Sequence, residues 1–323
     1  MFTLITIGDI KLDTFVVLND ASLQCQLKIP ECQLCLDYGG KIVVNMVDSQ
    51  MAGTAPNIAV GLSRMGQKTA VISNMGPDGI RKLSLEKLKK ENVSTHYIRS
   101  IKNAKSAYSV VLNYKGEKTL LTSHNQNAYR LPKPMPKTKW LYVGEMGNGY
   151  ESFFSNLAHY IRKKNILFGI NPGSIQISER RPALFELIKE AEVLFVNRSE
   201  AQTLIQKQID EIHHLATELY SLGAKIVVVT DGKNGAACFD GKTLLSIDVF
   251  PSKLVETTGA GDAFATGFIG ALMYTSTSED ALKWGSVNAA SVIEYVGPQE
   301  GLLSAKQIMA RLKKHPSFKP KKI

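Results

Sequence analysis

One stretch decides the fold of this chain: Val255-Glu256-Thr257-Thr258-Gly259-Ala260-Gly261-Asp262, which runs directly into the small and apolar residues 263–272. The apolar run predicts a helix, with the Gly-Ala-Gly turn at its N-terminus and Asp262 in or just before the first turn. Backbone N–H groups freed by glycine at the positive end of a helix make a site for an anion such as a phosphoryl group. A carboxylate there is placed to take a proton from a hydroxyl group that attacks the same phosphoryl group. An Asp that only caps a buried helix is the other interpretation.

The composition is that of a globular protein with ample chain for a core. Of the 323 residues 44% are hydrophobic and 21% are charged, and no apolar run reaches the roughly 18 residues of a membrane span. The N-terminus lacks the basic region and cleavage site of a signal peptide. We therefore expect a cytoplasmic enzyme that does not contact a membrane. Cys32 and Cys35 form a lone CxxC pair, with no second pair to complete a zinc site.

The formal charge of +10 allows either a nucleic-acid partner or an anionic substrate such as a nucleotide or sugar phosphate. Much of the excess positive charge lies in lysines at residues 313–323, a stretch interrupted by Pro316 and Pro320. We therefore expect a solvated, partly disordered basic tail and no nucleic-acid partner.

Strand and helix patterns alternate along most of the chain. Short apolar runs at 140–144, 166–170, 193–196 and 226–230 suit buried parallel strands, and helical segments separate them. This order predicts an α/β fold, a doubly wound and mostly parallel sheet with helices on both faces. Residues 14–48 and 105–124 instead read as extended segments and predict a small separate β sheet. We expect residues 1–323 to form a single domain.

Several short motifs, spread along the chain, resemble those of the ribokinase-type (PfkB) family of carbohydrate and nucleoside kinases. The TTGAGD residues 257–262 resemble its C-terminal signature, and residues 52–57 with Gly66 resemble its N-terminal glycine motif. The other pieces are Gly76, Asp78 and Gly79, the Asn197-Arg198-Ser199-Glu200 segment, and Thr230-Asp231-Gly232 with Lys233 and Gly235. The resemblance runs over nearly the whole chain. It implies a ribokinase-like α/β body, a β lid over the sugar, and ATP-dependent phosphorylation of a small sugar.

The family's catalytic roles fall on the opening stretch. The resemblance implies that Asp262 is the catalytic base and that Gly259, Ala260 and Gly261 form the anion hole. In such a site, positioning and electrostatics do most of the catalysis.

The acceptor side is implied by residues from three other places in the chain. Asp13, Gly53 and Asn57 resemble the family's contacts to the sugar hydroxyls, with Asp13 accepting two hydroxyl protons. Glu145 follows the strand at 140–144 and matches a position that often touches the substrate. Their structural alternatives are a turn at the end of a strand for Asp13 and a helix N-cap for Asn57.

The resemblance also implies a donor side. Asn197 and Glu200 would hold Mg²⁺ through water, because this ion sheds its hydration shell reluctantly; a plain helix cap is the alternative. Thr230 and Gly232 would approach the phosphates and ribose of ATP, and Asn288 would border the adenine. The alternatives are an ordinary strand-to-turn connection for the first two residues and a helix-surface Asn for Asn288.

Two departures from the family pattern bear on function. Glu256 stands where the family usually has an Asp that helps build a monovalent-cation site, so a K⁺ requirement stays open. Lys118 stands in the lid segment where an Arg is frequent. By family analogy we also expect a homodimer formed through the β lid.

The residues leave the substrate open. Apolar lid residues around Phe15, Val17 and Tyr108 would favour a nucleoside acceptor, and polar groups there would favour a sugar. A catalytically silent binding protein of the same fold is the alternative from another class. A dinucleotide-binding oxidoreductase is disfavoured, because only Gly8 follows the first strand and no G-x-G-x-x-G motif is present there.

Overall fold

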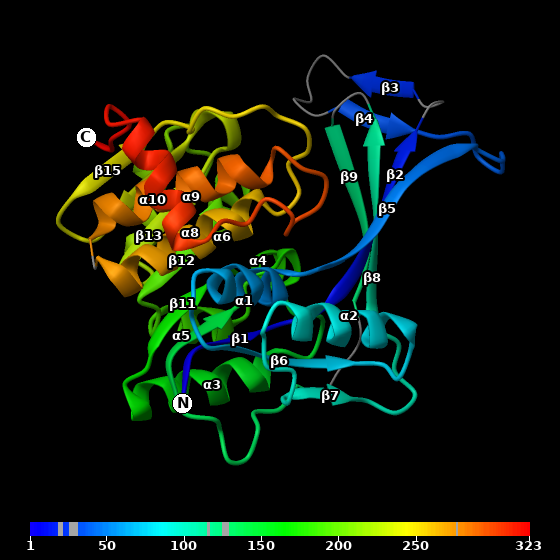
Figure 1. Ribbon diagram of the computed structural model, residues 1–323, viewed down its shortest axis with the longest axis horizontal. Helices are drawn as coiled ribbons and strands as arrows, with labels where there is room; N and C mark the ends of the chain where they lie inside the picture. Colours follow the sequence, from blue (N-terminus) through cyan, green and yellow to red (C-terminus); the bar gives the residue numbers. More distant parts are fainter. Residues whose placement is uncertain (19–21, 26–31, 115–116, 125–128, 276) are drawn as a thin grey trace.

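The computed structural model describes residues 1–323 apart from 19–21, 26–31, 115–116, 125–128 and 276. Within these residues the body of the protein is built on a ten-stranded sheet, ordered β16-β15-β14-β13-β12-β11-β10-β1-β6-β7 (Figure 1). Its strands are β1 (Phe2–Ile7), β6 (Thr69–Met75), β7 (Ile98–Ser100), β10 (Thr138–Val143), β11 (Leu167–Ile170), β12 (Val193–Asn197), β13 (Ile226–Thr230), β14 (Ala236–Phe239), β15 (Leu244–Ile247) and β16 (Lys321–Lys322).

In the order of the body sheet, the seven strands β7, β6, β1, β10, β11, β12 and β13 all pair in parallel. Strands β14, β15 and β16 add an antiparallel edge. Alternate residues of each central strand enter different hydrophobic clusters. In β12, for example, Leu194 and Val196 join one cluster while Val193 and Phe195 join the other. Burial on both faces explains why these strands read as continuous apolar runs. The predicted doubly wound, mostly parallel α/β fold is confirmed.

The two clusters are closed by two sets of helices, one on each face of the sheet. One set comprises α3 (Glu151–Lys164), α4 (Ser174–Glu179), α5 (Pro182–Ile188), α6 (Arg198–Ile205) and α7 (Ile212–Tyr220). The other comprises α1 (Thr54–Arg64), α8 (Ala260–Tyr274), α9 (Ser278–Val292) and α10 (Ala305–Lys314). Helix α2 (Gly79–Lys90) packs through Leu88 into a third cluster that also includes residues of α1. None of the helices described is both long and apolar enough to cross a bilayer.

A second sheet stands beside the body (Figure 1). Its strands, in the order β5-β2-β8-β9, are β5 (Val44–Ala52), β2 (Lys11–Leu18), β8 (Ala107–Tyr114) and β9 (Glu117–Ser123). We call this sheet the lid. Strands β3 (Ser22–Cys25) and β4 (Cys32–Cys35) form a separate two-stranded sheet, so the CxxC pair lies on β4. Only a short connection separates β1 from β2, so the lid is joined directly to β1, the third strand from the β7 edge of the body sheet.

The C-terminal segment, residues 313–323, is largely exposed, as predicted for a solvated tail, but it follows a regular path where we expected partial disorder. Helix α10 ends at Lys314, and β16 then pairs with β15 at the edge of the body sheet. The Phe318 ring lies 5.0 Å from that of Phe250, and Lys321 forms an ion pair of 2.8 Å with Asp248. The lysines are exposed, but the apolar residue between them fixes the segment on the body.

Candidate active site

Asp262 lies in the first turn of α8, as its sequence context predicts. Gly259 caps this helix with a φ of 80°, a left-handed conformation that glycine adopts without steric cost. The Asp262 carboxylate points to α1, where Asn57 Nδ2 donates a 2.7 Å hydrogen bond to its Oδ2. Burial raises the pKa of the Asp262 carboxyl group above its ordinary value, while hydrogen bonds from Asn57 and Thr54 oppose the rise. The carboxylate is therefore fixed in direction and is a stronger base than a solvated Asp.

The turn before Asp262 leaves backbone donors available. Ala260 N–H bonds to the carbonyl oxygen of Thr257 at 3.3 Å. The N–H groups of Gly261 and Asp262 have no backbone acceptor within the described chain, as the first turn of a helix dictates. Gly261 is exposed to solvent. Of the predicted anion-hole residues, Gly261 thus offers a free donor, whereas the N–H of Ala260 is already paired.

Asp13 lies on β2, facing the same region from the lid side. Asp13 is only 3% exposed, yet its Oδ1 has no hydrogen-bond partner among the described residues. Burial raises the pKa of its carboxyl group, and the neighbouring Lys11 and a hydrogen bond with Ser109 oppose this. A buried acceptor atom without a partner is costly. A hydroxyl group of a bound ligand is a fitting donor for it.

Gly53 and Asn57 shape the floor between Asp13 and Asp262. Gly53 caps α1 with a φ of 114°, and a side chain there would collide with the carbonyl oxygen of Asp9. The Asn57 side chain joins both sides of the floor: its Nδ2 holds Asp262, and its Oδ1 accepts a 2.8 Å bond from Gln299 Nε2. Asn57 is therefore not a mere N-cap. Gln299 was not predicted, since nothing near it in sequence marks it.

Glu145 is surrounded by two cations. Lys11 Nζ donates to its Oε2 at 2.6 Å, and His124 Nε2 lies 3.2 Å from its Oε1. Burial, the largest single influence, raises the pKa of Glu145, but His124 and Lys11 together outweigh it and lower the pKa to about 2. The Glu145 side chain is therefore ionised and committed to these two partners.

His124, at the end of β9, was also not predicted. Its Nδ1 lies 3.5 Å from Asp9 Oδ2, and the carboxylates of Asp9 and Glu145 raise its pKa to about 9. Asp9 accepts two hydrogen bonds, from the Tyr129 hydroxyl group at 2.7 Å and from Gly147 N–H at 2.9 Å. A charged network thus joins the lid to the end of β1. The residues come from distant parts of the sequence, so no local motif signals the network.

Asn197 and Glu200 meet at the end of β12, where they form a capping box. Asn197 Oδ1 accepts from Glu200 N–H at 2.9 Å, and Glu200 Oε2 accepts from Asn197 N–H at 2.8 Å. Burial raises the pKa of Glu200 to about 7, with the charges of Asp262 and Glu145 adding to the rise. The described residues contain no cluster of three His, Cys, Asp or Glu side chains that could hold a metal ion by themselves. Oxygen donors and an excess of negative charge nevertheless fit a hydrated Mg²⁺ shared with phosphates.

The residues predicted to border the nucleotide differ in their exposure. Thr230 ends β13 and Gly232 opens a short 3₁₀ turn, Gly232–Asn234, and the two are partly or fully exposed near the end of the sheet. Asn288, in contrast, is fully buried in α9. Its Nδ2 donates to the Ala263 carbonyl at 2.7 Å, and its Oδ1 accepts from Leu303 N–H at 3.0 Å. The prediction that Asn288 borders the adenine is therefore corrected: its side chain ties α9 to α8 and to the segment before α10.

Glu256 precedes the anion-hole turn and is 8% exposed. Its Oε1 accepts from the N–H and the hydroxyl group of Thr258 at 2.7 and 2.6 Å, while its Oε2 has no partner among the described residues. Lys118 of the lid reaches this loop, with Nζ 3.3 Å from Thr258 Oγ1 and 3.9 Å from Glu256 Oε1. The lid thus touches the loop that carries the catalytic turn.

A carboxylate at a helix N-terminus, beside free N–H groups and near polar side chains of the lid, is an arrangement that suits phosphoryl transfer to a hydroxyl group. The known proteins agree with this chemistry. Residues 21–305 match the pfkB family carbohydrate kinases, and the chain belongs to this family. The kinase activity and the family predicted from the motifs are confirmed.

The relatives differ in substrate. The chain is 25% identical over 273 residues to an ATP-dependent 6-phosphofructokinase of Thermoanaerobacterium thermosaccharolyticum, covering 81% of this chain and 84% of that one. It is 22% identical over 278 residues to a nucleoside kinase of Methanothermobacter thermautotrophicus, covering 83% and 86% of the two chains. The fold is that of an Arabidopsis thaliana ribokinase complexed with ribose and ATP, with a TM-score of 0.78, 21% identity and 97% and 99% of the chains covered.

Proposed function

We propose that this protein transfers the γ-phosphoryl group of ATP to a hydroxyl group of a small, uncharged sugar. The observation that carries the proposal is the Asp262 carboxylate, held by Asn57 at 2.7 Å and raised in pKa at the start of α8. Asp262 accepts the proton of the acceptor hydroxyl group as its oxygen bonds to the γ-phosphorus and the bond to ADP breaks. The free N–H groups at Gly261 and Asp262 stabilise the charge on the transferring oxygens.

The acceptor pocket supports a sugar over a nucleoside. Asp13 and Ser109 pair across β2 and β8, so they share one face of the lid. Tyr108 pairs with Leu12 and falls on the other face, where its hydroxyl group bonds to Thr14 Oγ1 at 2.9 Å. Phe15 shares the face of Asp13 and is as fully buried as Ser109. The unpartnered Oδ1 of Asp13 therefore offers the acceptor a polar contact on this face, and the Tyr108 ring lies on the other face.

Charge supports an uncharged acceptor. Lys11 and His124, the cations beside Glu145, are both paired with carboxylates. Asp13, whose Oδ1 has no partner among the described residues, and the base Asp262 are both acidic residues. A phosphate or carboxylate on the acceptor would add a negative charge to this pocket without gaining a free cation there.

Asn197 and Glu200 would hold Mg²⁺, through water and together with the phosphates of ATP. When bound, the ion neutralises negative charge on the phosphates. Burial, with the charges of Asp262 and Glu145 adding to it, raises the pKa of Glu200 to about 7, and a bound cation would relieve the repulsion among these acidic groups. In Glu200→Gln we expect half-maximal turnover to need more Mg²⁺; an unchanged Mg²⁺ requirement would argue for a purely structural cap. Thr230 and Gly232 are proposed to border the nucleotide.

Glu256 is the proposed site for a monovalent cation such as K⁺, supported by its buried Oε2 without a described partner. Lys118 already brings a positive charge to 3.9 Å from the other oxygen. We therefore expect K⁺ to stimulate turnover only weakly. Rates in K⁺ and in a tetramethylammonium buffer test this, and an absolute K⁺ requirement would contradict it.

The assembly is proposed from the edges of the lid, and the location from the use of ATP. The lid ends in β5 and β9 within the described residues, and β9 carries Leu120 and Leu121, 43% and 56% exposed. Such edges need covering, which supports a homodimer through the lid; sedimentation as a monomer at micromolar concentration would contradict it. The use of ATP supports a cytoplasmic location, which imaging of the tagged protein would test.

The central experiment measures ADP formation with Mg-ATP and three acceptor sets: neutral pentoses and hexoses, sugar phosphates, and nucleosides. We expect the highest kcat/KM for a neutral sugar. A higher value for a nucleoside would establish the nucleoside-kinase alternative. Turnover of no acceptor above the ATPase background would favour a silent binding protein.

A further inference from the structure

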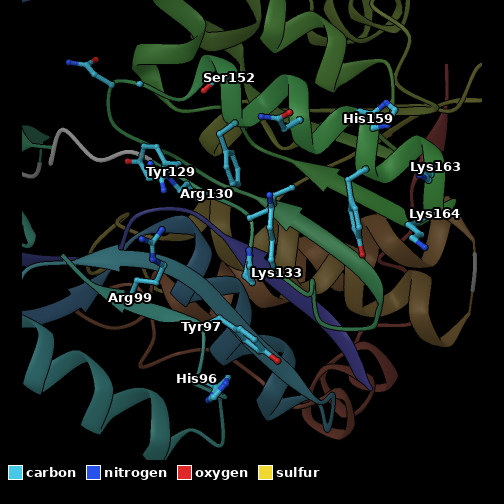
Figure 2. Close-up of a pocket in the computed structure, with 17 residues that line it drawn as sticks. His96, Tyr97, Arg99, Tyr129, Arg130, Lys133, Ser152, His159, Lys163 and Lys164 are labelled. Carbon is cyan, nitrogen blue, oxygen red and sulfur yellow. The ribbon is translucent and has the colours of Figure 1, made fainter.

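A concavity away from the proposed catalytic residues lies between α3 and the β7 edge of the body sheet. Figure 2 shows His96, Tyr97 and Arg99 on one side of it, His159, Lys163 and Lys164 of α3 on the other, and Lys133 between them. Its volume is about 1680 Å³, which exceeds the roughly 300–1,000 Å³ of most small-molecule pockets. We call it the basic groove. None of the residues predicted for the kinase site lines it.

The groove is positively charged throughout. Its lining contains no Asp or Glu but holds Arg99, Arg130, Lys133, Lys163 and Lys164, besides two histidines. In the described part of the chain none of these five cations forms an ion pair. By contrast Arg162, the neighbour of Lys163 on α3, is paired with Glu190. Five unpaired like charges around one hollow repel one another, and their energy falls when an anion with several charges binds among them.

The aromatic side chains of the groove suit an organic ligand. The Tyr97 ring lies 4.9 Å from that of His96 and 6.2 Å from that of Phe2. Tyr129 packs on Phe153, with ring centroids 6.1 Å apart. Apolar walls with convergent cations favour a compact organic molecule that carries phosphates. Such a molecule fills the groove, whereas a ligand that needs only an exposed charged surface would not use its apolar walls.

One lining residue connects the groove to the acceptor pocket. Tyr129 donates from its hydroxyl group to Asp9 Oδ1 at 2.7 Å. The other Asp9 oxygen faces His124 at 3.5 Å, and His124 Nε2 lies 3.2 Å from Glu145. A ligand that moves the Tyr129 ring therefore changes the position of charges beside the acceptor.

We propose that the basic groove binds a small molecule with two or more phosphate groups, and that Tyr129 transmits its binding to the acceptor pocket. The second half of this proposal rests on the kinase function proposed above. The first half does not, because binding to the groove is measurable without turnover.

Binding is tested by calorimetry with inorganic tripolyphosphate on the full chain. The groove variant Arg130→Ala/Lys133→Ala/Lys163→Ala is compared with a control, Lys82→Ala/Lys90→Ala/Lys314→Ala, that removes three exposed lysines elsewhere. The catalytic turn also binds anions, so the wild type and the control should show two sites and the groove variant one. If the groove variant still shows both binding sites, the proposal is overturned. Tighter binding of a single-stranded RNA at the groove would also overturn it and would make the groove a nucleic-acid surface.

Transmission is tested by steady-state kinetics with and without tripolyphosphate at saturating Mg-ATP. We expect tripolyphosphate to change the acceptor KM of the wild type about fivefold or more, within the usual range of coupling between two sites. The groove variant should keep its basal kcat and lose the response. Tyr129→Phe should bind tripolyphosphate normally yet show no KM change; a full response in that variant would overturn the role of Tyr129.

Discussion

Asn57 Nδ2 donates a 2.7 Å hydrogen bond to Asp262 Oδ2, joining the first helix of the body to the start of α8, 205 residues later in the chain. The same side chain accepts from Gln299 at 2.8 Å through its other end. Asn57 thus fixes the direction of the proposed base, so the acceptor floor and the phosphoryl-transfer turn form one unit.

Asp13 is expected to bind the acceptor and not ATP. In Asp13→Ala the acceptor loses hydrogen bonds to a charged, buried group, each worth about 1.5–3 kcal/mol. We predict that the acceptor KM rises roughly 10- to 100-fold while ATP affinity stays within about twofold. Asp37→Ala, in the exposed connection between β4 and β5, serves as the control. An unchanged acceptor KM would leave the buried Oδ1 without an explanation.

Asn288 is expected to be a stability residue. Asn288→Ala leaves the Ala263 carbonyl and Leu303 N–H unpaired in the core, at a cost of about 1–3 kcal/mol for each group. Urea denaturation should therefore show a large loss of unfolding free energy, with ATP affinity retained in the folded fraction. Asn156→Ala, on the exposed face of α3, should be neutral. Lost ATP affinity with unchanged stability would restore the nucleotide role of Asn288.

His124 should make stability depend on pH. Its pKa is about 9 in the folded protein against 6.5 ordinarily, so its contribution is complete below about 6.5 and is lost as the pH rises through about 9. Glu145, with a pKa of about 2, loses its contribution only in strong acid. We compare the unfolding free energies of the wild type and His124→Gln at two pH values. We predict that the advantage of the wild type is roughly 2 kcal/mol larger at pH 6 than above pH 9. Equal differences at both pH values would contradict the network.

Much of the body was predictable from local patterns. Runs such as Val193–Val196 are apolar because both faces of the strand are buried, and the glycine turn at 259–261 marks the start of α8. Asn57, Asp13 and Asp262 follow motifs whose elements meet at one region. Their convergence was implied by the resemblance of these motifs to those of the family.

Other features could not be read locally, because each depends on a distant partner. Lys11 and Glu145 are 134 residues apart, and a buried lysine carries no sign of its carboxylate in the sequence. The polar Asn288 suggested a helix surface or a ligand contact, but its side chain is buried and hydrogen-bonds to two backbone groups. The basic tail looked partly disordered because it is rich in lysine, yet the Phe318 ring packs on Phe250 and β16 extends the sheet.

The most direct test of the account is turnover and ATP affinity in Asp262→Asn, with Asp280→Asn, in the first turn of α9, as the matched control. The amide keeps the shape of the side chain but cannot take the hydroxyl proton. We predict ATP affinity within about threefold of wild type and a kcat lower by roughly 10²-fold or more, while the control stays active. Wild-type turnover in Asp262→Asn would remove Asp262 from the chemistry and contradict the proposed mechanism.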